Sequence, residues 1–381
     1  MRKLAIITTH PIQYNAPMFK IIAERQNIDV HVYYTWGEEV LESKYDPCFG
    51  KQIQWDIPLL SGYNFSFVKN TAKDKGSHHF RGIINPTLIE EIQNYHPDAI
   101  LVYGWSFYSH FKVMKYFKGK IPIYFRGDSH LLNNHNPIKN SIRKLYLKWV
   151  YRYIDKAFTV GKNNADYFLW AGVKEEQLIF APHAVENRRF ICTNKSEANL
   201  LRKELEIQKD ELVFLYAGKL IKRKNVSLLI EAFIDAKIPK SKLVLVGNGI
   251  LENELKELAK GHKNIKFLDF QNQGSMPAVY EITDVYVLPS AIDTWGLAVN
   301  EAMANGCAIL LSDKCGCAID LVENGTNGYT FKNNDKLDLI EKLKEMANAD
   351  IESFKMKGTE IISGYCYENF VEKIENELNS L

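Results

Sequence analysis

The chain has 381 residues against roughly 100–200 for one ordinary domain, so its length predicts two domains. Hydrophobic residues make up 46% and charged residues 25%, which excludes a disordered chain and a fibrous repeat. Residues 1–190 hold 25 Lys and Arg against 17 Asp and Glu, although the net charge of the chain is only +2. This basic amino-terminal half predicts either an anionic partner or a solvated basic face.

The six cysteines show neither Cys-x-x-Cys spacing nor a dense framework, which favours reduced thiols in the cytoplasm. No apolar run approaches the ~18 residues that a membrane-spanning helix needs, and the apolar start of the chain is too short for a signal peptide. We therefore expect a protein that is either free in the cytoplasm or peripheral on the inner face of the cytoplasmic membrane.

Short apolar runs alternate with amphipathic stretches along the whole chain. The strand-like runs are residues 4–8, 30–34, 99–102, 121–125 and 156–160, and then 212–216, 243–246, 265–268, 285–288 and 308–311. Helix-period segments lie at 16–23, 88–95, 227–236 and 251–259. Continuous apolar strands separated by helices predict parallel sheets that are covered on both faces.

Two such series predict an α/β protein with two Rossmann-like, doubly wound domains that face each other across a cleft. The expected domains are residues 1–190 and 191–366, followed by a helix over 367–381 that packs back on the amino-terminal domain. Ligands of parallel sheets bind at the carboxyl ends of strands, so the cleft is the expected site.

Three loops that follow strands of the amino-terminal half carry candidate acceptor or cleft residues. These are His10, Gln13 and Tyr14 after 4–8, Trp105 after 99–102, and Arg126, Asp128 and His130 after 121–125. Asp128 is the one acid among residues 101–150, which favours a catalytic carboxylate, although a staple between Asp128 and Arg126 is an alternative. Trp105 either stacks on a sugar or packs in the core, and His10 is either a ligand or a turn residue.

Residues 137–156 form a basic amphipathic stretch, with Asn136 placed to cap a helix. Its basic residues recur at near-fourfold spacing, and Leu145, Trp149 and Val150 are available for burial. This pattern predicts either contact with an anionic membrane or a polar outer helix face.

The segment 288–306 predicts a strand, a loop that contains Gly296, and a helix that carries Glu301 in its first turns. The free N–H groups of a helix start suit a phosphate oxygen, and Gly296 lets the backbone approach a ligand. Asp293 and Glu301 offer two carboxylates that can accept hydrogen bonds from sugar hydroxyls. An alternative is that these acids only complement the helix dipole.

Two further segments place basic residues and glycines after strands. Residues 216–230 predict a strand that ends at Gly218, a loop with Lys219 and Lys224, and a helix; the lysines either clamp a diphosphate or face water. Residues 245–255 predict a strand, a turn with Gly247 and Gly249, and a helix. Such a turn also serves close packing between strand and helix.

Together these segments resemble the nucleotide-binding half of GT-B glycosyltransferases, specifically glycosyltransferase family 4. That family shows Gly-Arg-Leu with a following Lys, Val-Gly-x-Gly, and Pro-Ser followed by Glu-x7-Glu-Ala-Met-Ala-x-Gly. The corresponding residues are Gly218-Lys219-Leu220 with Lys224, Val246-Gly247-Asn248-Gly249, and Pro289-Ser290 with Asp293-x7-Glu301-Ala302-Met303-Ala304-Asn305-Gly306. The resemblance runs in order from Gly218 to Tyr329.

The resemblance implies a role for each matching residue. Glu301 would hold the ribose hydroxyls of a nucleotide-sugar, and Lys219 and Lys224 would neutralise the diphosphate leaving group. Asp293 would contact a donor sugar hydroxyl. The other donor-binding residues would be Gly218, Gly247, Gly249, Trp295, Gly296 and Leu297. Two departures affect the donor: Asp293 is one methylene shorter than the family's Glu, and Lys219 lacks the bidentate geometry of the family's Arg.

The function expected from the resemblance is transfer of a sugar from a UDP- or GDP-sugar to a glycan or lipid-linked acceptor, in polysaccharide or glycolipid synthesis and with retention of configuration. A GT-B phosphorylase, a nucleotide-sugar epimerase and a non-catalytic nucleotide-sugar-binding module are the alternatives. We expect no cofactor and no metal, because the sequence has no Asp-x-Asp and Cys315-Gly316-Cys317 lacks accompanying zinc ligands. The near-neutral net charge of the chain and the absence of a recognisable nucleic-acid-binding motif argue against nucleic acid as a partner.

Overall fold

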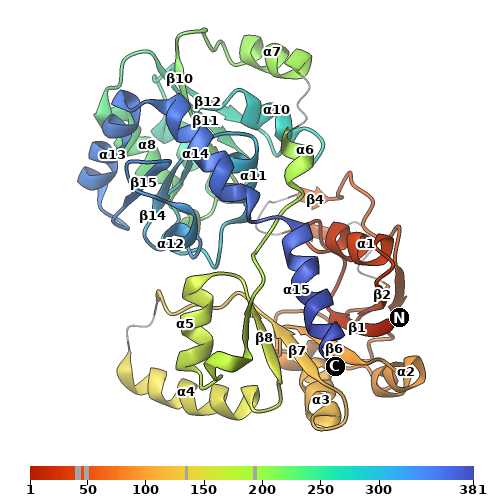
Figure 1. The fold of residues 1–381 in the computed structure, drawn as a ribbon. Coiled ribbons are helices and arrows are strands. Elements are labelled where there is room, and N and C mark those ends of the chain that lie inside the picture. Colours follow the sequence, from red (N-terminus) through yellow and green to blue (C-terminus); the bar gives the residue numbers. More distant parts are fainter. Residues whose placement is uncertain (39–43, 47–50, 134–135, 192–194) are drawn as a thin grey trace. The chain divides into compact units, whose positions relative to one another are not determined.

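The computed structural model describes residues 1–38, 44–46, 51–133, 136–191 and 195–381 (Figure 1). The chain forms two compact units. Unit 1 comprises Met1–Lys44, Pro58–His183 and Tyr367–Leu381, and unit 2 comprises Tyr45–Ile57 and Ala184–Cys366. The long segment of unit 1 thus ends at residue 183 rather than at residue 190, and a short piece of the amino-terminal half belongs to unit 2.

Unit 1 is built around a seven-stranded parallel sheet with the strand order β5-β2-β1-β6-β7-β8-β9. Its strands are β1 (Arg2–Thr8), β2 (Ile28–Tyr34), β5 (Asn64–Phe67), β6 (Ala99–Tyr103), β7 (Ile123–Arg126), β8 (Lys156–Thr159) and β9 (Leu178–Phe180). Its helices are α1 (Ala16–Glu24), α2 (Leu88–Tyr95), α3 (Tyr108–Phe117), α4 (Pro137–Tyr151), α5 (Lys162–Trp170) and α15 (Tyr367–Asn379).

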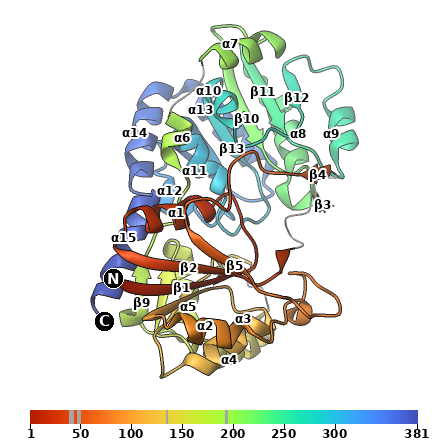
Figure 2. The ribbon, with the colours of Figure 1, turned by 90° about the vertical axis from the view of Figure 1, so that its right-hand side faces the viewer.

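The central strands of this sheet are buried on both faces. Leu4, Ile6 and Ile7 of β1 and Leu101 of β6 are fully inaccessible to solvent. Because successive side chains of a strand point to opposite faces, such runs require cover on both sides. Figure 2 shows that cover, with α1 and α15 on one face and α2, α3 and α4 on the other.

The carboxyl-terminal helix α15 is part of the core of unit 1. Phe370 and Ile374 recur at helical spacing and are fully buried. On the rim of the same helix, Glu375 forms an ion pair of 3.0 Å with Arg25 just beyond α1. The last residues of the chain therefore complete the layer that the first helix begins.

Unit 2 is built around a six-stranded parallel sheet with the order β12-β11-β10-β13-β14-β15. Its strands are β10 (Leu212–Ala217), β11 (Ser241–Val246), β12 (Ile265–Leu268), β13 (Val285–Leu288), β14 (Ala308–Ser312) and β15 (Gly328–Phe331). Its helices are α6 (Asn187–Ile191), α7 (Lys195–Glu204), α8 (Val226–Ala236), α9 (Glu252–Leu258), α10 (Met276–Glu281), α11 (Leu297–Ala304), α12 (Ala318–Leu321), α13 (Lys336–Asn348) and α14 (Ile351–Ser363). A separate two-stranded sheet pairs β3 (Lys44–Asp46) with β4 (Lys51–Ile53).

The strand order fixes where a ligand is expected in each sheet. In unit 2 the chain builds outward from β10 to β12, and then returns to lay β13, β14 and β15 on the other side of β10. In unit 1 the same reversal separates β1 from β6. The carboxyl ends of the two strands at such a reversal leave a crevice, because their following connections run to opposite faces of the sheet.

Candidate functional site

In unit 2, the loops after β10 and β13 flank the reversal of strand order. The first holds Gly218, Lys219 and a 3-10 turn over Lys222–Lys224, and the second runs from Pro289 to the start of α11. A hydrogen bond of 2.9 Å from the amide of Ala291 to the carbonyl of Arg223 joins the two loops. The structure therefore brings the predicted diphosphate loop and the predicted sugar loop together.

The glycines of the turn after β11 are explained by close backbone packing. A side chain at Gly247 would meet the carbonyl oxygen of Gly218 at 2.1 Å, and one at Gly249 would meet that of Leu220 at 2.4 Å. The amide of Leu220 donates to the carbonyl of Asn248 at 3.0 Å. These glycines support the Lys219 loop from below, and direct contact of Gly247 and Gly249 with a donor stays a prediction.

Lys224 and Asp293 form an ion pair at the centre of this site. The Lys224 ammonium donates to Oδ2 of Asp293, and the two side chains are 16% and 11% exposed. Ser290 Oγ lies 3.4 Å from the same carboxylate oxygen. The sequence predicts separate tasks for these residues, with Lys224 on the diphosphate and Asp293 on the sugar. Their contact means that each holds the other in place before any ligand binds.

Two buried tyrosines that were not predicted as site residues hold the backbone at the end of β10 and in the Lys219 loop by hydrogen bonds. Tyr216 of β10 donates from its hydroxyl to the carbonyl of Lys219 at 2.8 Å, and Tyr286 of β13 donates to the carbonyl of Ala217 at 3.2 Å. Burial raises the pKa of both phenols, and the nearby Asp293 carboxylate raises them further. Both therefore remain hydrogen-bond donors. Their position at the ends of the two strands beside the reversal is the signal that could have identified them.

The Cys315-Gly316-Cys317 segment braces the loop that carries Asp293. The amide of Gly316 donates to the carbonyl of Asp293 at 3.0 Å, and the amide of Cys317 donates to that of Trp295 at 3.2 Å. A side chain at residue 316 would lie 1.8 Å from the carbonyl oxygen of Thr294. The thiols of Cys315 and Cys317 are fully buried, and burial raises their pKa.

The start of α11 exposes backbone rather than an aromatic ring. Gly296 caps the helix in a left-handed conformation with φ 102°, where a side chain would also meet Leu288. The indole of Trp295 is 2% exposed and donates to Oδ1 of Asn300 at 2.8 Å. The Trp295 indole thus packs inside unit 2, and contact of a donor with the main chain at Trp295 or with Leu297 stays a prediction.

Glu301 is a buried carboxylate on α11. It is 3% exposed, and Oε2 accepts a hydrogen bond of 2.8 Å from the hydroxyl of Tyr280. In addition to the effect of burial, the charges of Asp293 and Glu301 both raise the pKa of Tyr286. The two predicted carboxylates therefore share one neighbourhood, although Asp293 is neutralised by Lys224 and Glu301 is held by a neutral phenol.

In unit 1, the loop after β1 holds the first group of predicted cleft residues. His10 is half-buried, with Nδ1 2.9 Å from Thr9 Oγ1, and Gln13 is 8% exposed. The carbonyl of Tyr14 accepts a hydrogen bond of 3.0 Å from the hydroxyl of Tyr367 on α15. Roles for His10, Gln13 and Tyr14 in ligand binding stay predictions.

Arg126 holds neighbouring segments of unit 1 together, and a contact of Arg126 with a ligand stays a prediction. Its guanidinium is buried, donates to the carbonyls of Ala181 and Pro182 at 2.9 and 3.1 Å, and stacks 4.3 Å from the ring centre of Phe370. Burial lowers its pKa to about 10. Arg126 thus fastens the end of β7 to the residues after β9 and to α15.

A pocket of about 300 Å³ opens at the carboxyl ends of β6 and β7 in unit 1. Its lining includes Trp105, Asp128 and Ser129 from the two strand ends, and Arg143 and Tyr146 from α4. Trp105 and Tyr146 meet edge to face, with ring centres 5.6 Å apart. Two predicted residues, Trp105 and Asp128, therefore share one concave site.

His130 does not line this pocket. It is 8% exposed, and its Nδ1 accepts a hydrogen bond of 3.2 Å from the amide of Leu132. This contact fixes the loop after β7.

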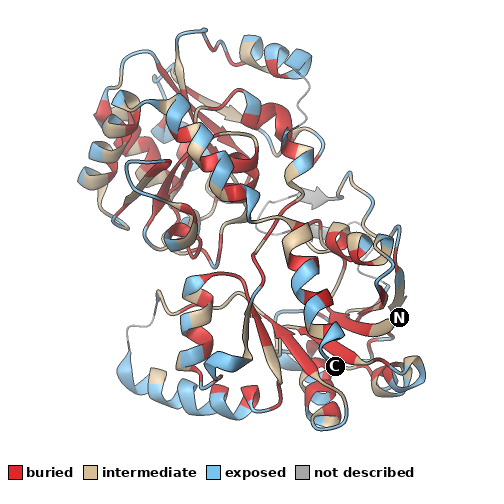
Figure 3. Cartoon of the chain, in the orientation of Figure 1, coloured by how far each residue is buried: buried red, intermediate tan, exposed pale blue. Residues whose placement is uncertain are grey.

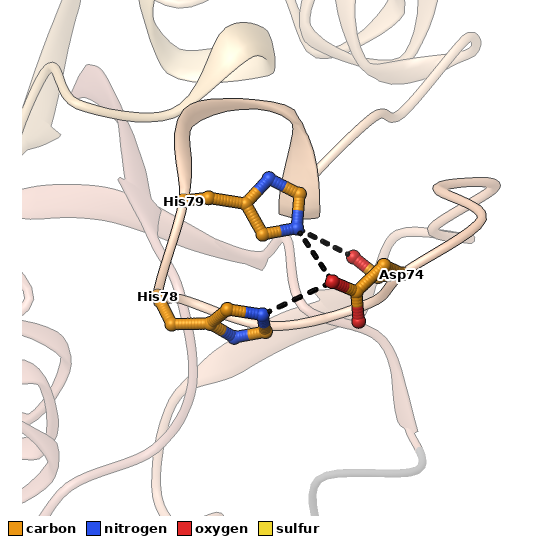
Figure 4. A group of neighbouring side chains, drawn as sticks. All are labelled: Asp74, His78 and His79. Atoms are coloured by element: carbon orange, nitrogen blue, oxygen red, sulfur yellow. Dashed lines mark hydrogen bonds and ion pairs between the residues drawn. The ribbon is translucent and has the colours of Figure 1, made fainter.

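A cluster of metal-ligating side chains lies in the loop between β5 and α2. Within the part of the chain that the structure describes, Asp74, His78 and His79 are the group whose ligand atoms all lie within 4.8 Å of one another (Figure 4). Nε2 of each histidine lies 3.2 Å from Oδ2 of Asp74. The hydrogen bond from His78 lowers the pKa of Asp74. These hydrogen bonds account for the geometry of the cluster, which belongs to neither the unit 2 loops nor the pocket.

Part of unit 2 is similar to proteins of known family. Residues 197–357 match the family model of group 1 glycosyl transferases. Alpha-monoglucosyldiacylglycerol synthase of Acholeplasma laidlawii is 30% identical over 147 residues, which cover 37% of this chain and 36% of that protein. UDP-Gal:alpha-D-GlcNAc-diphosphoundecaprenol alpha-1,3-galactosyltransferase of Escherichia coli is 29% identical over 206 residues, which cover 51% of this chain and 52% of that protein. The chain thus spans about half, or less, of the length of these curated relatives.

Solved structures match the whole chain. Anabaena HepE in complex with UDP has a TM-score of 0.74 at 17% identity, with 100% of each chain covered. WaaG, a glycosyltransferase involved in lipopolysaccharide biosynthesis, has a TM-score of 0.67 at 14% identity, with 99% of this chain and 100% of that chain covered. With two parallel-sheet units in tandem, the fold is GT-B. None of the helices in the described residues is long and apolar enough to cross a membrane.

Proposed function

We propose that the protein transfers a sugar from a nucleoside-diphosphate sugar to a glycan or lipid-linked acceptor. The observation that carries the proposal is the joining of the two loops at the reversal of strand order in unit 2, with Lys224 and Asp293 paired between them. The family match over residues 197–357 covers both loops. The donor is a UDP- or GDP-sugar, and UDP is favoured because the structural neighbour HepE was solved with it.

The chemistry follows from the charge that develops during transfer. As the bond between sugar and phosphate breaks, negative charge grows on the departing diphosphate. Preorganised cations and backbone N–H groups at that position stabilise the transition state more than the ground state. In our proposal Lys219 and Lys224 supply the cations, the amides at the start of α11 supply the N–H groups, and Glu301 accepts hydrogen bonds from the ribose.

Asp293 in this proposal has two tasks. Its carboxylate orients the Lys224 ammonium, and it accepts a hydrogen bond from a hydroxyl of the donor sugar. Because Asp293 would contact both the Lys224 ammonium and the donor sugar, the sugar–phosphate bond that breaks would lie between that ammonium and the sugar. Retention of configuration is part of the proposal and comes from the family resemblance.

We further propose that the acceptor binds in the pocket of unit 1. Aromatic rings at Trp105 and Tyr146 suit the apolar face of a sugar, while the Asp128 carboxylate suits its hydroxyls. A pocket of about 300 Å³ is at the lower end of the usual range for small-molecule sites and accommodates one sugar unit. One relative, by its name, makes a glycolipid and another acts on a lipid-linked sugar, which favours a lipid or lipid-linked acceptor.

The reaction in this proposal needs no metal, since lysines replace the cation at the diphosphate. Turnover should therefore persist in excess EDTA and should not rise with added Mg²⁺ or Mn²⁺. The proposal also includes a cytoplasmic location. Buried thiols outside any disulfide, such as Cys307, are compatible with a reducing compartment.

The decisive test is release of nucleoside diphosphate. Purified protein is incubated with UDP- or GDP-sugars, with and without a membrane-lipid extract from bacterial cells, and the nucleoside diphosphate and the labelled lipid product are measured. We expect release that depends on acceptor, loss of release in Lys219→Ala, and unchanged release in Lys209→Ala, which removes an exposed lysine that precedes β10, at the opposite end of that strand from Lys219. Isomerised donor without acceptor would instead identify an epimerase, and binding without release would identify a non-catalytic module.

The acceptor site has a separate test. Asp128→Asn keeps the size of the side chain and removes its charge, so the KM for acceptor should rise or kcat should fall while the affinity for UDP-sugar stays unchanged. A wild-type profile in both measurements would remove Asp128 from the reaction.

A further inference from the structure

The outer face of α4 carries a row of exposed apolar side chains. Ile138, Ile142 and Leu145 are 75%, 65% and 71% exposed. Spacings of four and three residues put them on one face of the helix, and Trp149 continues the row. The residue opposite this row, Leu147, is buried against the rest of unit 1. Of the residues that the sequence makes available for burial, Leu145 is 71% and Trp149 39% exposed, whereas Val150 is buried.

Figure 3 shows how little of α4 is covered, with its first turns exposed. A single exposed apolar residue on a protein surface is common, but a continuous row of them marks a surface that meets a partner. Asn136 caps the helix by accepting the amide of Lys139 at 3.0 Å, so the helix is well formed although most of its apolar side chains face outward.

Basic residues flank the apolar row on both sides. They are Lys139 on one side and Lys144, Lys148 and Arg152 on the other. No acid occurs in α4, and among the described residues no carboxylate pairs with Lys139, Lys144 or Lys148. The basic surface continues onto α3, where Lys112 and Lys115 are exposed. The helices adjoin, since the ring centres of Phe111 and Trp149 are 5.1 Å apart.

We propose that α4 docks unit 1 on the surface of an anionic lipid bilayer. An apolar row bordered by cations is the pattern of a helix that lies in a membrane interface, with its apolar side among acyl chains and its lysines at lipid phosphates. Tyr146 beside the row and Trp149 at its end suit the headgroup level. The charge complementarity selects a bilayer that contains anionic lipid over a neutral one.

Docking in this way has a consequence for the acceptor, which rests on the function proposed above. Arg143 and Tyr146 belong to α4 and also line the pocket that holds Asp128. The Arg143 guanidinium lies 5.6 Å from the ring centre of Tyr167, on the pocket side of the helix. A membrane-bound α4 therefore presents the pocket beside the lipid headgroups, and a lipid-linked acceptor reaches the pocket without leaving the bilayer.

The test measures binding to vesicles and needs neither donor nor turnover, so its failure and the failure of the proposed function are distinguishable. Tag-free protein is sedimented with sucrose-loaded vesicles of phosphatidylcholine that contain 30% phosphatidylglycerol, and with vesicles of phosphatidylcholine alone. We expect binding to the anionic vesicles that weakens with salt. Each cation at such a surface contributes about a fivefold gain in partition, so Lys144→Glu/Lys148→Glu should lower partition by at least about 25-fold.

The apolar row is tested by Ile142→Ser/Leu145→Ser, which should lower partition by on the order of tenfold or more. All four positions are exposed, so the variants should fold like the wild type, and circular dichroism melts check this. The matched control is Leu200→Ser/Lys203→Glu in α7 of unit 2, where one exposed leucine and one exposed lysine are changed. This control should bind anionic vesicles like the wild type.

Two results would overturn the proposal. One is wild-type protein that fails to sediment with anionic vesicles, or α4 variants that bind as well as the wild type. The other is a dimer of the wild type in sedimentation velocity without lipid that the Ile142→Ser/Leu145→Ser variant dissolves, because the apolar row would then belong to an interface between two copies of the chain.

Discussion

Variants of the ion pair between Lys224 and Asp293 can separate the contribution of Lys224 to stability from its contribution to catalysis. In Lys224→Met the Asp293 carboxylate stays in place, 11% exposed, without the cation that balances it. Removing one partner of a buried pair costs about 3–5 kcal/mol, because the remaining charge is left desolvated. Both side chains keep some contact with solvent, so we expect the lower end, about 3 kcal/mol. For a unit of this size that corresponds to a fall in Tm of roughly 6–12 °C.

The double variant Lys224→Met/Asp293→Asn removes both charges together. Its stability should return to within about 1 kcal/mol of the wild type, so the costs of the single changes should not add. Activity should behave differently. If Lys224 neutralises the leaving diphosphate, kcat/KM should fall by one to three orders of magnitude, about 1.4–4 kcal/mol, in the single variant and should stay low in the double variant.

The assay combines thermal unfolding with release of nucleoside diphosphate, measured below the melting temperature of every variant. Lys222→Met is the matched control, because Lys222 belongs to the same 3-10 turn but is exposed. It should leave both stability and turnover near wild type. If the double variant regained turnover along with stability, Lys224 would act only by balancing the charge of Asp293, and the diphosphate role would be refuted.

Other consequences of the structure can be measured in the same way. Glu301→Gln keeps an acceptor for the Tyr280 hydroxyl, so the protein should fold while its affinity for UDP-sugar, by calorimetry, falls about 10- to 100-fold; unchanged affinity would remove the ribose role. Arg126→Met should lower the Tm of unit 1 by leaving two buried carbonyls without donors, with kcat/KM at low temperature little changed. Burial lowers the pKa of His110 to about 4 and that of His183 to about 3. Since the unfolded state binds more protons below pH 6.5, unit 1 should lose about 2 kcal/mol per histidine between pH 6.5 and pH 5, and calorimetry on His110→Gln should show a smaller slope.

The sequence predicts the central strands of both sheets because those strands are buried on both faces. Continuous apolar runs such as 243–246 have no competing interpretation when helices flank them, and β11 forms there in parallel with β10 and β12. The edge strand β5, Asn64–Phe67, escapes the same reasoning. It is short, alternates polar and apolar residues, and packs on one neighbour only.

In the candidate site, likewise, the sequence predicts some features and not others. The positions of Gly218 and Asp293 after strands, and of Glu301 in the helix that follows, come from the order of elements, because the carboxyl ends of parallel strands share one edge. The contacts do not follow from that order. That Lys224 pairs with Asp293 depends on how the loops after β10 and β13 fold back, and that Tyr280 holds Glu301 depends on how α10 and α11 are placed. No periodicity in the sequence encodes either contact.

Arg126 and α4 show the remaining difficulty, which is the direction that a side chain faces. A charged residue after a strand is equally compatible with an open crevice and with buried carbonyls, and the carbonyls after β9 decide the case for Arg126. Helical spacing groups Ile138, Ile142 and Leu145 on one face but does not say which face meets the core. Leu147, Val150 and Tyr151 lie on the side of α4 that packs on the rest of unit 1, and further buried residues follow the helix. The apolar row is therefore left for a partner, and its basic border fits the anionic bilayer proposed above.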